Sequence, residues 1–223
     1  MNAELLTIPT IIGLAFIHTA AGPDHYLPFI AISKHKQWSW GKTCWLTFFC
    51  GIGHIVSSVL LGLIGAAAGI ALVRLEQFQD IRGSIAAWAL MIFGLGYTIW
   101  GLFHIWRHSS NKTHSHFLLH KGSHAHEKKK ELTPWVLFII FVFGPCEVLI
   151  PMLLYYGLHA EYARMATMSV IFGAVTIATM LTIVYIAYRG LSFVRFGFLK
   201  KTAPVITGSA ILLCGAAIQF FGL

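Results

Sequence analysis

The stretch Gly22-Pro23-Asp24-His25-Tyr26-Leu27-Pro28 decides how this chain folds, because it puts two prolines and two ionisable side chains inside an apolar segment. A second stretch, Gly144-Pro145-Cys146-Glu147-Val148-Leu149-Ile150-Pro151, follows the same plan 122 residues later. Proline lacks an N–H group and its ring clashes with the carbonyl four residues back, so both stretches predict broken helices. The residues expected to break them are Gly22, Pro23, Pro28, Gly144, Pro145 and Pro151.

The similarity between the two halves continues beyond the prolines. Each stretch opens with Gly-Pro, continues with two metal-capable side chains and closes with another proline. The same offset aligns Gly51 with Gly173 and His54 with Thr176. We interpret the pattern as an internal repeat.

The composition is that of an integral membrane protein. Of the 223 residues, 57% are hydrophobic and 11% charged, and the mean hydropathy is +0.73. Only helices and closed barrels satisfy their backbone in lipid, and alternating barrel strands are absent from the sequence, so the spans are predicted to be α-helices. The net charge of +8 falls in short loops, which indicates membrane topology and not nucleic-acid binding.

The apolar runs predict an all-α membrane fold of six transmembrane helices in two sets of three, with helices 1 and 4 broken by proline. The expected spans are 5–33, 43–73, 83–106, 134–158, 164–188 and 203–222. With three spans in each set, the second set enters the bilayer from the opposite side, so the repeats are inverted. The predicted domains are the repeats at 1–106 and 134–223, with a cytoplasmic loop at 107–133 between them.

The basic residues predict the orientation. Most of the 16 lysines and arginines follow odd-numbered spans, which predicts a multi-pass protein of the cell (inner) membrane with both termini outside. Only Arg74, Arg82 and Arg164 fall on the other side. The loop at 107–133 is rich in histidine, which either chelates transition metals weakly or belongs to a solvated basic loop that serves topology alone. Its candidate metal contacts are His108, His114, His116, His120, His124 and His126.

Several ionisable side chains lie inside the apolar spans, where they are costly enough to be read as functional. Carboxylate, imidazole and thiolate together suit a divalent transition ion better than Mg²⁺ or Ca²⁺, which prefer oxygen ligands alone. The predicted metal ligands are His18, Asp24, His25, His54, Cys146 and Glu147. The alternatives are prolines that merely kink a helix for packing, histidines packed in the core and a cysteine that serves as a small apolar residue.

Helix geometry sets a condition on this site. On a continuous helix His18 and His25 stand ~10 Å apart along the axis, whereas metal–nitrogen bonds are ~2 Å. They share one ion only if the helix opens at Gly22-Pro23. Gly51 and Gly53 precede His54 and are expected to let the second helix approach the first closely.

The segment His18-Thr19-Ala20-Ala21-Gly22-Pro23-Asp24-His25 resembles the first signature of nickel/cobalt transporters, and the chain as a whole resembles their NicO-type branch, which includes urease-accessory-like membrane proteins. The later Gly-Pro-Cys-Glu stretch is similar to the second motif of that branch. The resemblance implies that His18, Asp24 and His25 recognise metal. The histidine-rich loop is likewise similar to that of nickel/cobalt exporters.

These observations predict a secondary transporter, not an enzyme, that moves Ni²⁺ or Co²⁺ through a site between the two broken helices. Efflux is favoured over uptake, because the loop would collect cytoplasmic metal. No permanent cofactor is expected; the expected partners are the metal ion, the lipid bilayer, and a metallochaperone or a second copy of the chain. One alternative is an exporter of small anions or amino acids, and another is an accessory protein that hands metal to an enzyme. A third is a carrier resembling the thiol–disulfide electron carriers of cytochrome c biogenesis, although the offset places Asp24, and not a second cysteine, opposite Cys146.

Overall fold

The computed structural model describes residues 3–69, 72–110, 133–144, 146, 148–193 and 202–221. These ranges contain helices and no strand, which confirms the all-helical class. The elements are α1 (Ala3–Ala21), the 3₁₀ turn η1 (Pro23–His25), α2 (Leu27–His35), α3 (Trp40–Ala67), α4 (Leu72–Ser110), α5 (Thr133–Phe143), α6 (Leu149–Leu158), α7 (Tyr162–Phe193) and α8 (Ala203–Phe221).

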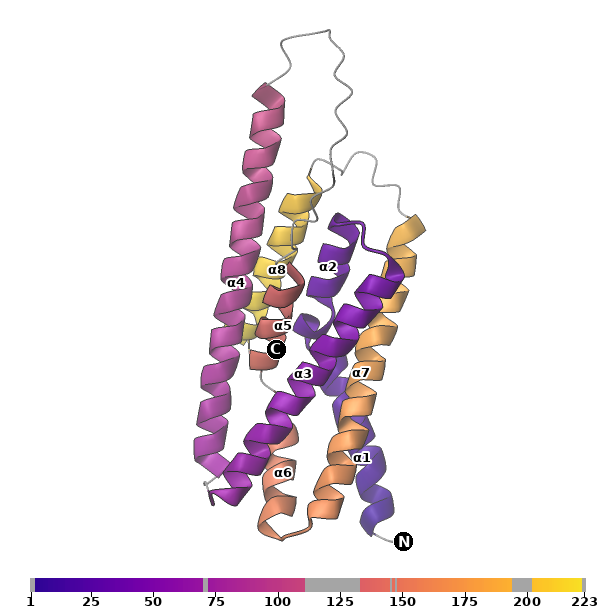
Figure 1. The fold of residues 1–223 in the computed structure, drawn as a ribbon, viewed down its shortest axis with the longest axis vertical. Helices are drawn as coiled ribbons and strands as arrows, with labels where there is room; N and C mark the ends of the chain where they lie inside the picture. The colour runs from indigo at the N-terminus through magenta and orange to yellow at the C-terminus, as the bar shows by residue number, and fades with distance from the viewer. Residues whose placement is uncertain are drawn as a thin grey trace, which may run out of the picture.

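Four of these helices are long and apolar enough to cross a bilayer. They are Trp40–Ala67, Val73–Arg107, Tyr162–Gly190 and Ala203–Phe221. The shorter apolar stretches are Ile8–Ala21 of α1, Thr133–Phe143 and Leu149–Leu158. In Figure 1, α1 and α2 lie one above the other, and so do α5 and α6. The chain is therefore a multi-pass helical membrane protein. The count of six spans and the inverted repeat remain predictions, because a helix of about ten residues does not cross ~30 Å of hydrocarbon alone.

Two of the prolines that were expected to break helices act differently from expectation. Pro23 begins the 3₁₀ turn after α1, and the break there follows the prediction. Pro28 and Pro151, however, stand in the first turns of α2 and α6, where backbone N–H groups have no partner within the helix. They start the second half-helix and do not break the first. Pro145 lies outside the described residues.

Helix α3 crosses the bundle diagonally (Figure 1) and contacts α5, α6 and α7. On one side α1 packs against α7, and on the other α4 packs closely along α8. Glycines make the α4–α8 approach possible: a Cβ at Gly208 would meet the backbone of Thr98, and one at Gly94 the backbone of Leu212. Such small-residue contacts are typical of helix pairs in membranes.

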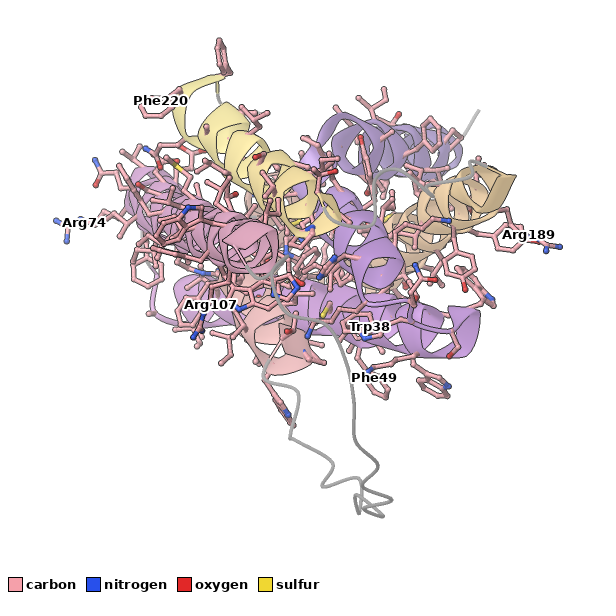
Figure 2. The ribbon with its side chains drawn as sticks, turned by 90° about the horizontal axis from the view of Figure 1, so that it is seen from above. Trp38, Phe49, Arg74, Arg107, Arg189 and Phe220 are labelled. Atoms are coloured by element: carbon pink, nitrogen blue, oxygen red, sulfur yellow. The ribbon has the colours of Figure 1, made fainter. Side chains whose placement is uncertain are left out.

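Two helix boundaries differ from the predicted spans. Helix α3 ends at Ala67, before the predicted 73, because Gly69 takes a left-handed conformation with φ +61 that terminates a helix. Helix α4 begins at Leu72, before the predicted 83, since its polar first turns hid it from a search for apolar runs. Figure 2 shows Arg74 on this helix and Arg189 on α7 at opposite edges of the bundle, both pointing away from it.

Candidate functional site

The break after α1 brings two histidines together. Helix α1 ends at Ala21, and η1 turns the chain so that the ring centroids of His18 and His25 lie 4.9 Å apart. The opening at Gly22-Pro23 that their proximity requires is therefore present. Gly22 is needed here, because a Cβ would lie 2.6 Å from His25 Nδ1 and 2.8 Å from Asp24 Oδ1.

His25 is held by its Nδ1 atom. This nitrogen lies 3.0 Å from Asp24 Oδ1 and 3.2 Å from the carbonyl oxygen of Gly22. Both partners accept hydrogen bonds, so Nδ1 carries a hydrogen. The ring is only 2% exposed, and its Nε2 has no hydrogen-bond partner. Asp24 thus orients His25.

His54 on α3 is held in the same way. Its Nδ1 donates to the carbonyl oxygen of Phe141 at 3.3 Å, which leaves the Nε2 lone pair without a partner. The side chain is 2% exposed, and its ring centroid lies 5.2 Å from that of His25. The neighbouring glycines act on other helices than expected: a Cβ at Gly51 would meet Ile177 of α7, and one at Gly53 would meet Phe138 of α5. They let α3 approach α5 and α7, which carry bulky side chains at these positions, and not the first span.

Cys146 completes the group from the break between α5 and α6. It is fully buried, and one ligand atom each of Cys146, His18 and His54 lie within 4.8 Å of one another. The structure thus gathers side chains from α1, η1, α3 and the second break. We call the set of His18, Asp24, His25, His54 and Cys146 the central cluster.

A small cavity adjoins the central cluster. It measures about 20 Å³ and is lined by Asp24, His25, His54 and Gly144 together with apolar residues of α4, α5 and α8. That volume accommodates about one water molecule.

Arg82 is a functional candidate that the sequence interpretation missed. Its guanidinium, 8% exposed, donates to Gln79 Oε1 at 3.0 Å, Ser57 Oγ at 3.1 Å and the carbonyl oxygen of Val142 at 2.8 Å, with a longer contact of 3.5 Å to that of Gly144. It therefore ties α3 and α4 to the end of α5, two residues before Cys146. The sequence interpretation counts Arg82 among the loop charges. The signal that could have identified its role is an arginine inside a helix, three residues after a glutamine.

The structure does not describe the other predicted ligands. Glu147 lies outside the described residues, as do His114, His116, His120, His124 and His126, and the side chain of His108. No disulfide joins the four cysteines, all of which are described. Cys50 and Cys214 pack in a different apolar cluster from the one that contains Cys146.

The fold and the central cluster define a class: a multi-pass helical membrane protein with buried imidazoles and a buried thiol at the breaks of its helices. The chain belongs to the family described as the cytochrome C biogenesis protein transmembrane region, which matches residues 27–218. No curated protein matches the chain, and no solved structure matches it either.

The family corrects the resemblance to nickel/cobalt transporters of the NicO-type branch. That resemblance rested on two short motifs, which report a local helix break and its polar neighbours, whereas the family match extends over most of the chain. Family membership does not support nickel or cobalt transport. It agrees better with the alternative of a membrane thiol-redox carrier.

Proposed function

We propose that this protein is a membrane thiol-redox carrier whose working thiol is Cys146. Membership of the cytochrome c biogenesis family supports this class of function. The observation that carries the proposal is the position of Cys146: fully buried, in the break between two half-helices, with ring nitrogens of His18 and His54 within 4.8 Å of its sulfur. Thiolates are the reactive form of cysteine, and a neighbouring imidazole promotes their formation.

The carrier requires partners with their own thiols, because Asp24 stands where the repeat would place a second cysteine. In the first step an imidazole Nε2 takes the Cys146 proton, and the thiolate attacks the disulfide of an acceptor protein. A mixed disulfide forms, the acceptor's own S–S bond breaks, and the released acceptor sulfur takes up a proton.

A donor dithiol protein completes the cycle. One donor thiolate attacks the Cys146 sulfur, which releases the fully reduced acceptor. The second donor thiolate then attacks the first donor sulfur, closing the donor disulfide and releasing Cys146 as the thiolate. In sum, two electrons and two protons pass from the donor dithiol to the acceptor disulfide, and Cys146 returns to its starting state.

The burial of Cys146 adds a condition to this cycle. A sulfur with no exposed surface meets a partner only after the α5–α6 break has moved. The exchange rate is then set by that opening, in the way that many membrane carriers are limited by a conformational step.

The test is electron transfer in liposomes that contain the purified protein. A small protein with a reduced dithiol is added outside as the donor, and a membrane-impermeant aromatic disulfide is enclosed as the reporter. We expect the reporter to be reduced by the wild type and by a variant that retains only Cys146 (Cys44→Ser, Cys50→Ala and Cys214→Ala). Cys146→Ser is expected to abolish the reaction, whereas Cys214→Ala, which removes another buried thiol, retains it. Reduction that persists in Cys146→Ser would overturn the proposal.

A further inference from the structure

We infer that His18, His54 and Cys146 form a binding site for one thiophilic transition-metal ion. The inference goes beyond the proposed redox function and does not depend on it, because it rests on the imidazole geometry and the donor chemistry. Its carrying observation is the convergence of three ligand atoms, from α1, α3 and the α5–α6 break, within 4.8 Å of one another.

The separations suit a single ion. Nitrogen and sulfur ligands lie ~2.0–2.3 Å from Zn²⁺ at tetrahedral angles, which places neighbouring ligand atoms ~3.5 Å apart. Atoms already within 4.8 Å reach that spacing through small rotations of the side chains. No helix has to move for the three ligands to close on an ion.

The unpartnered nitrogens are the second argument. The Nε2 atoms of His18, His25 and His54 are all buried and have no hydrogen-bond partner. Buried polar atoms are nearly always paired, and leaving one unpaired is costly. Three such atoms in neighbouring rings therefore indicate an occupant at the point where the rings meet.

The opposite ring nitrogens strengthen the argument. His54 Nδ1 is bound to the Phe141 carbonyl oxygen, and His25 Nδ1 to Asp24 and the Gly22 carbonyl oxygen. A histidine that binds metal through one nitrogen usually donates its other N–H to a carbonyl or carboxylate, which fixes the tautomer. Both rings thus show the arrangement of metal-binding histidines. Asp24, which the sequence predicted as a ligand, instead accepts a hydrogen bond from His25.

The donor set selects the kind of ion. Two imidazoles and one thiolate suit Zn²⁺, Co²⁺ or Cu⁺, whereas Mg²⁺ and Ca²⁺ require oxygen ligands. Three protein ligands leave a fourth tetrahedral position open, as in exchangeable metal sites. The His25 ring centroid lies 4.9 Å from that of His18 and 5.2 Å from that of His54.

The test is Co²⁺ titration of the full-length purified protein, followed by optical absorption. Binding at the site produces a sulfur-to-cobalt charge-transfer band that saturates at one equivalent and is removed by Zn²⁺. Cys146→Ser is expected to abolish the band, and His18→Ala and His54→Ala to weaken binding by about tenfold or more. The matched controls are Cys214→Ala, which removes a different buried thiol, and His159→Gln, which removes an exposed histidine.

The outcomes separate this inference from the redox function. Co²⁺ binding without the charge-transfer band, or a band that survives in Cys146→Ser, would overturn the metal site, whatever the liposome assay shows. A saturable band in a protein that transfers no electrons would support the metal site and overturn the redox proposal. Circular dichroism of each variant, compared with the wild type, verifies that the loss of the band is not a loss of fold.

Discussion

Replacing Arg82 by glutamine is expected to loosen the break that carries Cys146. The guanidinium makes three hydrogen bonds of 3.1 Å or less, to Gln79, Ser57 and Val142, and the glutamine side chain is too short to replace them all. Hydrogen bonds to charged groups contribute ~1.5 kcal/mol or more in soluble proteins, but polar contacts between membrane helices average only ~0.6 kcal/mol. Three bonds at these two values give a loss of about 2 to 4.5 kcal/mol in the free energy of unfolding.

The assay has two readouts and a matched control. Unfolding in detergent, followed by circular dichroism, measures the free energy of unfolding, and the rate of maleimide labelling of the Cys146-only protein measures the opening of the break. A change of 1.4 kcal/mol is a factor of ten in an equilibrium, so we expect labelling to accelerate by at least about tenfold. Arg74→Gln removes the same charge from the same helix, but its side chain is exposed and points away from the bundle (Figure 2).

The reasoning would be refuted if Arg82→Gln and Arg74→Gln behaved alike in both readouts. Accelerated labelling without loss of overall stability would still support it, because the hydrogen bonds would then restrain only the α5–α6 break. Arg82→Lys is informative as well. Lysine keeps the charge, but its single ammonium group cannot reach all the partners of the guanidinium. We therefore expect Arg82→Lys to have a stability and a labelling rate between those of the wild type and Arg82→Gln.

Three further changes test other parts of the structure. Gly22→Ala places a Cβ 2.6 Å from His25 Nδ1, and this overpacking is expected to lower the free energy of unfolding in detergent by about 1–3 kcal/mol. An unchanged free energy of unfolding would show that the turn adjusts to the added methyl group. Gly208→Ala is expected to lower stability because its Cβ meets the backbone of Thr98, whereas Gly96→Ala, with nothing within 4 Å, is expected to raise it by about 0.5–1 kcal/mol. An equal change in stability in Gly208→Ala and Gly96→Ala would contradict the close packing of α4 against α8. Asp24→Asn is expected to leave the charge-transfer band in place, because Asp24 bonds to His25 and neither residue is one of the three proposed ligands; a loss of Co²⁺ binding as large as that of His18→Ala would contradict this.

The sequence predicted the features that depend on local chemistry. A proline after a glycine inside an apolar run acts on its own neighbours, so the break at Gly22-Pro23 was predictable. That break in turn explains how His18 and His25 meet, which a continuous helix forbids. The intramembrane position of His54 and Cys146 likewise followed from their apolar surroundings.

The features that depend on packing partners were not predictable. Gly51 and Gly53 indicated a close approach, but nothing in their spacing distinguishes α1 from α5 and α7 as the helix that approaches. Arg82 was assigned to a loop because charge counting treats every arginine as exposed, whereas two of its three acceptors, on Ser57 and Val142, come from distant parts of the chain. Short motifs also misled the choice of family, since different membrane proteins place similar polar residues at a broken helix.

The turn between α1 and α2 also has a mechanical consequence. A continuous helix behaves as a stiff rod, so a tilt at one membrane surface is transmitted to the other. In this protein the rod is divided at residues 22–26, and backbone hydrogen bonds that would keep the halves aligned are replaced by those of a short 3₁₀ turn. Each half-helix is then able to lean by itself about the turn at His25, so that α1 and α2 need not move together.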